Sequence, residues 1–364
     1  MVLVSILGDF HSSILPIFFE FKEKLTHHII IHDDSKYDMN QANKLIQAQK
    51  DFISLYKDDK DINFELIDIT IDEDDYEDII KTYEKIKSLT NKNNIYLNAT
   101  DGLNSVGIVL SNKFLDLGSN VIVYDKFSNT YNLHKQNSIN RIKIKNNTDI
   151  KNHLRLKGYS LLDYSNKFEL QNRKDDILRL CENLTELKEL GSKLQESKLN
   201  NVSGYEKYKK ILKKLNQSNN VSFIQGTVFE EYIYWIIKDN FDFDDVMVGL
   251  KIEFEKDFEN ELDIVMIKDN HLHTIECKFV NYIKGEHFVY KTNSIIDYLD
   301  DDGKAMILSI GGDNTKITNS GNKKLQFTIG DQARASNGNI KIHQNKTFKK
   351  SKFIEDVKKH FLAN

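Results

Sequence analysis

Three charged residues lie in a segment that otherwise has the pattern of a buried β-hairpin. In residues 261–279, apolar and polar residues alternate on both sides of a polar turn at 268–270, which predicts two paired strands. Asp263 precedes this turn, and Glu276 and Lys278 follow it. Burying a charge costs several kcal/mol unless the charge is paired or binds a metal. The hairpin therefore needs a chemical reason to keep all three.

These residues have the composition of a metal-dependent hydrolytic site. Folding the hairpin about its turn brings Asp263 beside Glu276, and the two-residue spacing puts Glu276 and Lys278 on one face of their strand. With the backbone carbonyl of Cys277, the carboxylates form an oxygen-rich ligand set for Mg²⁺ or Mn²⁺. Such a cation favours ionisation of a water that attacks phosphorus, and Lys278 would orient that water or stabilise the transition state. The alternative is an internal ion-pair ladder in which Lys278 bridges both acids.

The neighbouring segments supply the other parts of a nuclease core. Residues 225–237 predict a helix that carries Glu230 and Glu231 and lies before the hairpin in the chain. Residues 290–299 predict a second helix, and residues 304–311 predict another apolar strand. A helix followed by an Asp…Glu-x-Lys hairpin is the order of parts in the PD-(D/E)xK nuclease core. In that core a helical glutamate often joins the metal site, and Glu230 is the residue predicted to do so here.

The N-terminal third predicts a different architecture, an open parallel sheet. Apolar strand-like runs alternate with amphipathic helical segments from residue 1 to about residue 135, a pattern typical of α/β folds with both sheet faces covered. Two loops, 8–13 and 100–105, join a strand to a helix N-terminus, where ligands with phosphate groups bind. Ordinary helix caps and turns explain the same residues equally well. A G-x-G-x-x-G motif and a Walker A motif are both missing, which argues against a nicotinamide dinucleotide.

Composition limits the classes of function. The 364 residues are enough for two or three domains, and a hydrophobic fraction of 40% permits a packed core. A net charge of -4 provides no global attraction to nucleic acid or to membranes, so a nucleic-acid surface must be local. The two cysteines exclude a disulfide framework. The chain has no basic leader and no long apolar run, so we expect a cytoplasmic protein that does not bind membranes.

Two basic segments are candidates for nucleic-acid contacts, although each also fits a solvated helix face. The first is the lysine-rich stretch 207–214 in a helical, charged connector. The second is the C-terminal tail, where Phe348 and Phe353 alternate with basic residues. His271 and His273 flank the hairpin turn, and we interpret them as surface residues of the hairpin. The basic residues of the tail are Arg334, Lys341, Lys346, Lys349, Lys350 and Lys352.

The combination resembles the CARF-domain nucleases of type III CRISPR systems. These proteins join an N-terminal Rossmann-like (CARF) domain to a PD-(D/E)xK restriction-endonuclease-like domain, and the resemblance covers nearly the whole chain. The segment LNATDGLNSVGI at 97–108 is similar to the strand-four motif of the CARF domain, with departures at Asp101, Leu103 and Asn104. The resemblance implies an α/β fold with a nucleotide-sensing domain at 1–138, a helical linker at 139–218 and a nuclease domain at 219–364.

The resemblance also implies an activator and an assembly. Members of the family respond to cyclic oligoadenylate, most often cyclic tetra-adenylate, and bind it on the two-fold axis of a homodimer. A symmetric ring suits such an interface. The substrate would be DNA, RNA or both, cut in antiviral defence with Mg²⁺ or Mn²⁺. The residues expected to hold the activator are Gly8, Asp9, Phe10, His11, Ser12, Ser13, Thr100, Asp101, Gly102, Leu103 and Asn104.

Other functions fit parts of the same pattern. A constitutive DNA-processing or restriction-type nuclease would use the N-terminal domain only for dimerisation, and it would cut without any nucleotide. A non-enzymatic sensor would carry a silent nuclease fold, but the intact set of Asp263, Glu276 and Lys278 argues against it. The N-terminal domain could also open the cyclic ligand that it binds.

Overall fold

The computed structural model of the chain consists of two units, Met1–Ser160 and Leu161–Ala363. Each unit has its own sheet and its own hydrophobic core. The structure describes residues 1–6, 14–33, 64–89, 91, 94–100, 104–195, 205–217, 220–255, 258–279, 285–300, 302–310, 327–345 and 347–362.

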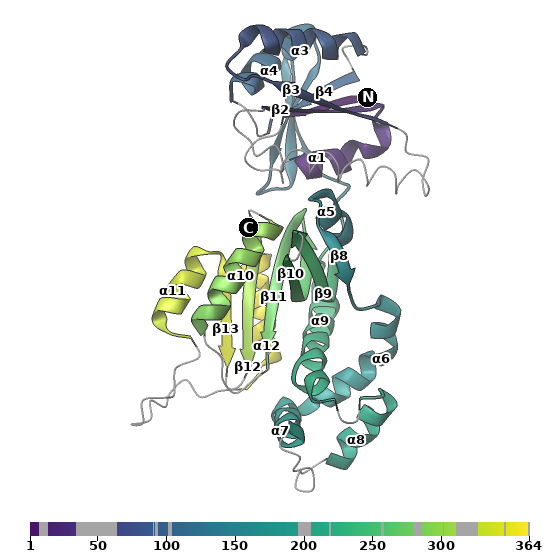
Figure 1. The fold of residues 1–364 in the computed structure, drawn as a ribbon, viewed down its shortest axis with the longest axis vertical. Coiled ribbons are helices and arrows are strands. Elements are labelled where there is room, and N and C mark those ends of the chain that lie inside the picture. The colour runs from purple at the N-terminus through teal and green to yellow at the C-terminus, as the bar shows by residue number, and fades with distance from the viewer. Residues whose placement is uncertain are drawn as a thin grey trace. The chain divides into compact units, whose positions relative to one another are not determined.

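A seven-stranded sheet forms the centre of the first unit, in the order β3-β2-β1-β4-β5-β6-β7 (Figure 1). Its first five strands are parallel, and β1 lies between β2 and β4. This is the parallel sheet that the alternating strand and helix segments predict. The five strands are β1 (Val2–Ile6), β2 (His27–Asp33), β3 (Glu65–Ile71), β4 (Ile95–Asn98) and β5 (Asn120–Asp125).

Helices cover both faces of this sheet. Successive residues of a strand point to opposite faces, so β1 contributes side chains to two cores. Val2 and Val4 of β1 pack in one core with residues of α3 and α4. Leu3 packs in a second core with Leu15 and Phe18 of α1. The continuous apolar run of β1 reflects burial on both sides. The helices are α1 (Ile14–Phe21), followed by a 3₁₀ turn (Lys22–Lys24), α3 (Tyr76–Leu89) and α4 (Asn104–Leu117).

The first sheet ends in an antiparallel hairpin of β6 (Thr130–Lys135) and β7 (Ser138–Lys143). β7 lies at the edge of the sheet and is polar and largely exposed, as suits an edge strand. Arg141 of β7 donates a hydrogen bond of 2.8 Å to Asp125 at the end of β5. A short helix, α5 (Ile150–Leu156), follows, and its N-cap residue Asp149 accepts a hydrogen bond from the backbone of Asn152.

A six-stranded mixed sheet forms the centre of the second unit, in the order β13-β12-β11-β10-β9-β8. The strands β9, β10 and β11 are antiparallel, whereas β11, β12 and β13 run parallel. The sequence predicts the β10–β11 hairpin and β12 but not the long strand β9. The strands are β8 (Ser160–Asp163), β9 (Asp245–Glu255), β10 (Phe258–Lys268), β11 (His271–Lys278), β12 (Lys304–Ile310) and β13 (Ile340–Asn345).

Two pairs of helices cover the second sheet. Residues of α9 and α12, such as Phe229 and Phe353, share a core with Ile264 and Cys277. On the opposite face, Val289 of α10 and residues of α11 form a smaller cluster with β12 and β13. Figure 1 shows these helices against the sheet. The helices are α9 (Val228–Asn240), preceded by a π-helical segment (Phe223–Thr227), α10 (Gly285–Leu299), α11 (Ile329–Asn337) and α12 (Lys350–Phe361).

The helical, charged segment that contains the lysine-rich stretch 207–214 packs against the core of the second unit through α6, α7 and α8. The lysines of α8 pair with neighbouring acids: Lys207 lies 2.7 Å from Glu182, and Lys214 lies 2.6 Å from Asp176. These contacts favour a structural, solvated role over nucleic-acid binding for this segment. The helices are α6 (Lys167–Leu180), a 3₁₀ turn (Cys181–Asn183), α7 (Leu184–Gln195) and α8 (Tyr205–Lys214).

The aromatic residues of the basic tail belong to the core. Phe353 is fully buried, and Phe348 packs against Phe229 and Tyr232. They are therefore not surfaces on which nucleic-acid bases stack. Among the described residues, none of the helices has the length and apolarity that a membrane crossing requires.

Candidate active site

The register of β10 and β11 puts the two predicted carboxylates at the end of the hairpin that lies away from its turn. Residues 269–270 have positive φ angles of 51° and 68°, which suit a tight turn between twisted strands. The register pairs Ile264 with Ile275, so Asp263 and Glu276 occupy the next positions on facing strands. Since side chains alternate across a strand, both carboxylates lie on the same face of the sheet.

The carboxylates, the lysine and one backbone group are in direct contact. The backbone N–H of Cys277 donates a hydrogen bond of 2.6 Å to Oδ2 of Asp263. Nζ of Lys278 lies 2.6 Å from Oε1 of Glu276 and 3.5 Å from Oδ2 of Asp263. The structure thus brings together Asp263, Glu276 and Lys278, as the spacing predicts. Taken alone, these contacts would also describe an ion-pair ladder in which Lys278 bridges Asp263 and Glu276.

Helix α10 adds two residues that sequence reasoning missed. Nζ of Lys291 lies 3.7 Å from the same Oε1 of Glu276 that pairs with Lys278. The ring centroid of Phe288 lies 5.1 Å from Nζ of Lys278, within range of a cation–π contact. In the sequence, Lys291 is marked only by its position next to the buried face of the predicted helix at 290–299. Many lysines occupy such positions.

Two adjacent glutamates begin α9, and the structure separates their environments. Glu231 is completely buried and forms an ion pair of 2.6 Å with Arg173 of α6. Glu230 lies close enough to Asp263 for the charge of that carboxylate to raise its pKa. The π-helical segment before α9 contains Gly226, where a Cβ atom would lie 3.4 Å from Oε1 of Glu230. Of the two glutamates, Glu230 is therefore the one whose charge interacts with that of the hairpin carboxylate Asp263.

Burial and a neighbouring carboxylate raise the pKa values of Glu230 and Asp263. Burial and the charge of Asp263 raise the pKa of Glu230 to about 8. Burial and the charge of Glu276 raise the pKa of Asp263 to about 6, against the opposing effect of Lys278. Burial would lower the pKa of Lys278, but the charges of Asp263 and Glu276 outweigh it and raise that pKa above the usual lysine range. Glu230 is therefore mainly protonated at pH 7.

The crowded acids fit a divalent cation. Carboxylate oxygens of Asp263, Glu276 and Glu230 are the hard ligands that Mg²⁺ and Mn²⁺ prefer. Burial is the main cause of the raised pKa values of Glu230 and Asp263, and the charge of a neighbouring carboxylate raises each of them further. A cation would relieve this repulsion, which an ion-pair ladder alone does not.

Residues 217–350 match the family model of the Card1-like endonuclease domain. The C-terminal part of this chain is therefore similar to that domain. The matched segment contains α9, the β10–β11 hairpin and α10, and therefore all of the charged cluster. No curated protein sequence matches the chain.

Solved structures share the fold of the whole chain, including its endonuclease domain. Can2 from Sulfobacillus thermosulfidooxidans, solved in complex with cyclic tetra-adenylate, aligns over 99% of both chains with a TM-score of 0.68 and 17% identity. The protein VC1899 from Vibrio cholerae aligns over 99% of this chain and 96% of its own, with a TM-score of 0.72 and 17% identity. A type III CRISPR defence DNA nuclease activated by cyclic oligoadenylate aligns over 92% of this chain and 51% of its own, with a TM-score of 0.51 and 10% identity.

The predicted activator loops lie mostly outside the described residues. Residues 8–13 and 101–103 are among those that the structure does not describe, and of Asn104 only the backbone is described. Thr100 lies after the end of β4, and its hydroxyl accepts a hydrogen bond of 2.8 Å from the backbone N–H of Tyr124. The assignment of these loops to a nucleotide ligand stays a prediction.

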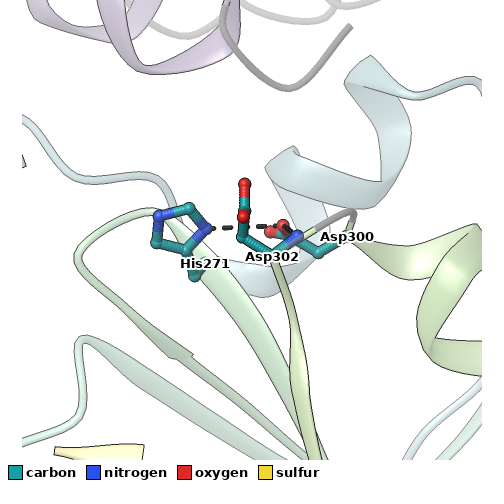
Figure 2. A group of neighbouring side chains, drawn as sticks. All are labelled: His271, Asp300 and Asp302. Carbon is teal, nitrogen blue, oxygen red and sulfur yellow. Dashed lines mark hydrogen bonds and ion pairs between the residues drawn. The ribbon is translucent and has the colours of Figure 1, made fainter. Parts of the chain in front are cut away.

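A second group of polar side chains lies at the turn end of the hairpin, and Figure 2 shows His271, Asp300 and Asp302. Each offers one ligand atom, all within 4.8 Å of one another. The buried carboxylate of Asp300 accepts hydrogen bonds of 3.0 Å from the backbone N–H groups of Leu272 and Asp302. These bonds connect the end of α10 to the start of β11 in the endonuclease domain, so we assign the group a structural role.

The interpretation of both hairpin histidines as surface residues is wrong for His273. This side chain is buried, and burial lowers its pKa to about 3. Its Nδ1 accepts a hydrogen bond of 3.1 Å from the backbone N–H of Lys304. His271 is half-buried, and its Nδ1 lies 3.4 Å from Oδ1 of Asp300. Along β11, His271 is five residues from Glu276, or about 17 Å by the rise of a strand, so neither histidine belongs to the carboxylate site.

Proposed function

We propose that this chain is a metal-dependent endonuclease that cuts DNA, RNA or both and is activated by cyclic oligoadenylate in CRISPR antiviral defence. The observation that carries the proposal is the convergence of Asp263, Glu276 and Lys278 at one end of the β10–β11 hairpin, within a Card1-like endonuclease domain. The fold shared with Can2, which was solved with cyclic tetra-adenylate, supports the regulatory part.

The residues of the site divide the work of phosphodiester hydrolysis. Asp263, Glu276 and the backbone carbonyl of Cys277 would hold Mg²⁺ or Mn²⁺, and the carboxylate of Glu230 would complete the ligand set. When bound there, the cation would make a water easier to ionise and would offset the negative charge of the phosphate. Lys278 contacts both hairpin carboxylates, so its ammonium group is placed to orient the attacking water and to stabilise the charge that develops on phosphorus.

The N-terminal parallel sheet supplies the place for an activator. Loops at the carboxyl ends of parallel strands bind ligands, and backbone N–H groups at helix N-termini favour phosphates. The loops at 8–13 and 100–104 follow β1 and β4, which are neighbours in the sheet. We propose that these loops from two protomers of a homodimer hold the ring on a two-fold axis.

Addition of cyclic tetra-adenylate is expected to raise the cleavage rate about a hundredfold, since moving an equilibrium from 1:99 to 99:1 multiplies the active fraction by that factor. The measurement is the rate at which purified protein cuts labelled DNA and RNA, in Mn²⁺ and in Mg²⁺, with and without the ligand. Equal rates in both arms would favour the constitutive nuclease and remove the sensor role. Analysis of the ligand after incubation reports whether the protein also opens the ring.

The affinity of the site for Mn²⁺ is expected to rise between pH 6 and pH 8. Asp263 and Glu230 have pKa values of about 6 and about 8, and each must lose its proton to bind a cation. Isothermal titration calorimetry in buffers of different ionisation enthalpy measures both the affinity and the number of protons released. Glu230→Gln should flatten the upper part of the pH dependence. An affinity that does not change with pH in the wild-type protein would contradict the ligand assignment.

A further inference from the structure

Two ammonium groups from different elements converge on a single carboxylate oxygen of the proposed nuclease site. Lys278 of β11 lies 2.6 Å from Oε1 of Glu276, and Lys291 of α10 lies 3.7 Å from the same atom. Lys278 alone completes a close ion pair with Glu276. The second lysine adds like charge to a small volume, so its presence needs an explanation.

Stabilisation of the fold is a weak explanation for Lys291. A third of its side chain is exposed, against a fifth for Lys278, and its distance to Glu276 is too long for a direct hydrogen bond. Partly exposed ion pairs of this kind contribute about 0–1 kcal/mol to the free energy of unfolding. Lys278 is in addition held against the ring of Phe288, whereas Lys291 is the more solvent-accessible of the two.

The charges of the site point to a substrate instead. The proposed site has the three carboxylates of Glu230, Asp263 and Glu276, and it has the two ammonium groups of Lys278 and Lys291. With all three acids ionised around one divalent cation, the site carries one net positive charge. A phosphodiester carries one negative charge, so it balances the complete site. Without Lys291 the loaded site would be neutral and would lose this complementarity.

We propose that Lys291 is a further catalytic residue, whose ammonium group binds a non-bridging oxygen of the phosphodiester that is cut. This inference rests on the proposed nuclease function. A cation bound to Glu276 would neutralise the negative charge that attracts both lysines in this structure. Lys278 stays beside Asp263 and Phe288, and the more exposed Lys291 is then available to the substrate. The two lysines therefore have separate roles, one toward the attacking water and one toward the phosphate.

The first test compares cleavage by Lys291→Gln, Lys291→Arg and the matched control Lys238→Ala, which removes an exposed lysine from the far end of α9. We expect Lys291→Gln to lower kcat about a hundredfold, a usual loss for one donor to a developing charge. Lys291→Arg should recover most of that loss, because arginine also contacts phosphate. The control should cut at the wild-type rate. Wild-type kcat in Lys291→Gln would overturn the proposal.

The second test measures binding without cleavage. The affinity of the protein in Mn²⁺ for a single-stranded phosphorothioate oligonucleotide, which keeps one charge per linkage and resists cleavage, is followed by fluorescence anisotropy as salt is varied. Losing one phosphate contact should reduce the slope of log K against log salt by about 0.7. Lys291→Gln should show this reduced slope, and Lys238→Ala should keep the wild-type slope. An unchanged slope for Lys291→Gln would overturn the proposal even if the wild type cuts. If the wild type binds but never cuts, the nuclease proposal fails and the slope still decides the phosphate contact. A wild-type protein that neither binds nor cuts an oligonucleotide overturns both proposals.

Discussion

Replacing Asp263 by asparagine, or Glu276 by glutamine, is expected to lower the single-turnover cleavage rate by at least about a thousandfold. Each change removes one negative ligand oxygen while keeping the shape of the side chain. A catalytic cation is worth several kcal/mol of transition-state stabilisation, and each 1.36 kcal/mol corresponds to about a tenfold change in rate. The measurement is cleavage of a labelled substrate at saturating Mn²⁺, with the proposed activator present.

The fold should survive these two substitutions. An asparagine at 263 keeps an oxygen that accepts the hydrogen bond from Cys277, so the end of the hairpin retains its backbone contact. Binding of cyclic tetra-adenylate and the midpoint of thermal unfolding should therefore stay close to wild type. Asp242→Asn, an exposed position before β9, is a matched control that should leave the rate unchanged. Cleavage within tenfold of wild type for Asp263→Asn would contradict the proposed role of the hairpin carboxylates.

The hairpin could be predicted because its determinants are local. Alternation with period two, a polar turn and the positions of Asp263 and Glu276 fix which side chains share a face. Lys291 could not be predicted in the same way. Its approach to Glu276 depends on how α10 is rotated on the sheet, and that rotation is set by packing such as that of Val289 with Ala305 and Ile307 of β12.

Burial assigns the aromatic residues of the tail and one further strand to the core. Basic residues around Phe348 and Phe353 have the pattern of a nucleic-acid surface, but the spacing of Phe353, Val357 and Phe361 is that of a buried helix face. No strand was predicted at β9, although the buried residues Leu250, Ile252 and Phe254 alternate there with charged residues. In both cases the spacing of the apolar residues agrees with the burial that the structure shows.

The choice between Glu230 and Glu231 also depends on a distant contact. The two residues are adjacent and chemically identical, so no spacing rule separates them. Arg173, which lies 58 positions before Glu231, forms the ion pair that gives Glu231 a structural role. This pair connects α6 to α9, and α9 carries Glu230 toward the hairpin carboxylates.

Replacing Arg173 by methionine is expected to lower the free energy of unfolding by about 1–2 kcal/mol at pH 8, since it leaves the completely buried Glu231 without its partner. Burial already raises the pKa of Glu231 to about 7, and Arg173 holds it down. Without Arg173 the folded pKa rises further, so the variant keeps Glu231 protonated and loses about 1.4 kcal/mol relative to wild type for each pH unit above 7. The effect of Arg173→Met should therefore be small from pH 4 to pH 6 and grow as pH rises through 7 to 8.

Chemical denaturation from pH 4 to pH 8 measures this dependence, and a penalty that is the same at every pH would contradict the ion-pair explanation. The double variant Arg173→Met, Glu231→Leu removes both charges, so it should recover most of the lost stability. The same variant tests the assignment of the two glutamates. If Glu231 is structural, the double variant cuts nucleic acid at a rate near wild type, whereas Glu230→Gln remains slow although its fold is intact. A slow double variant of normal stability would instead place Glu231 in the chemistry.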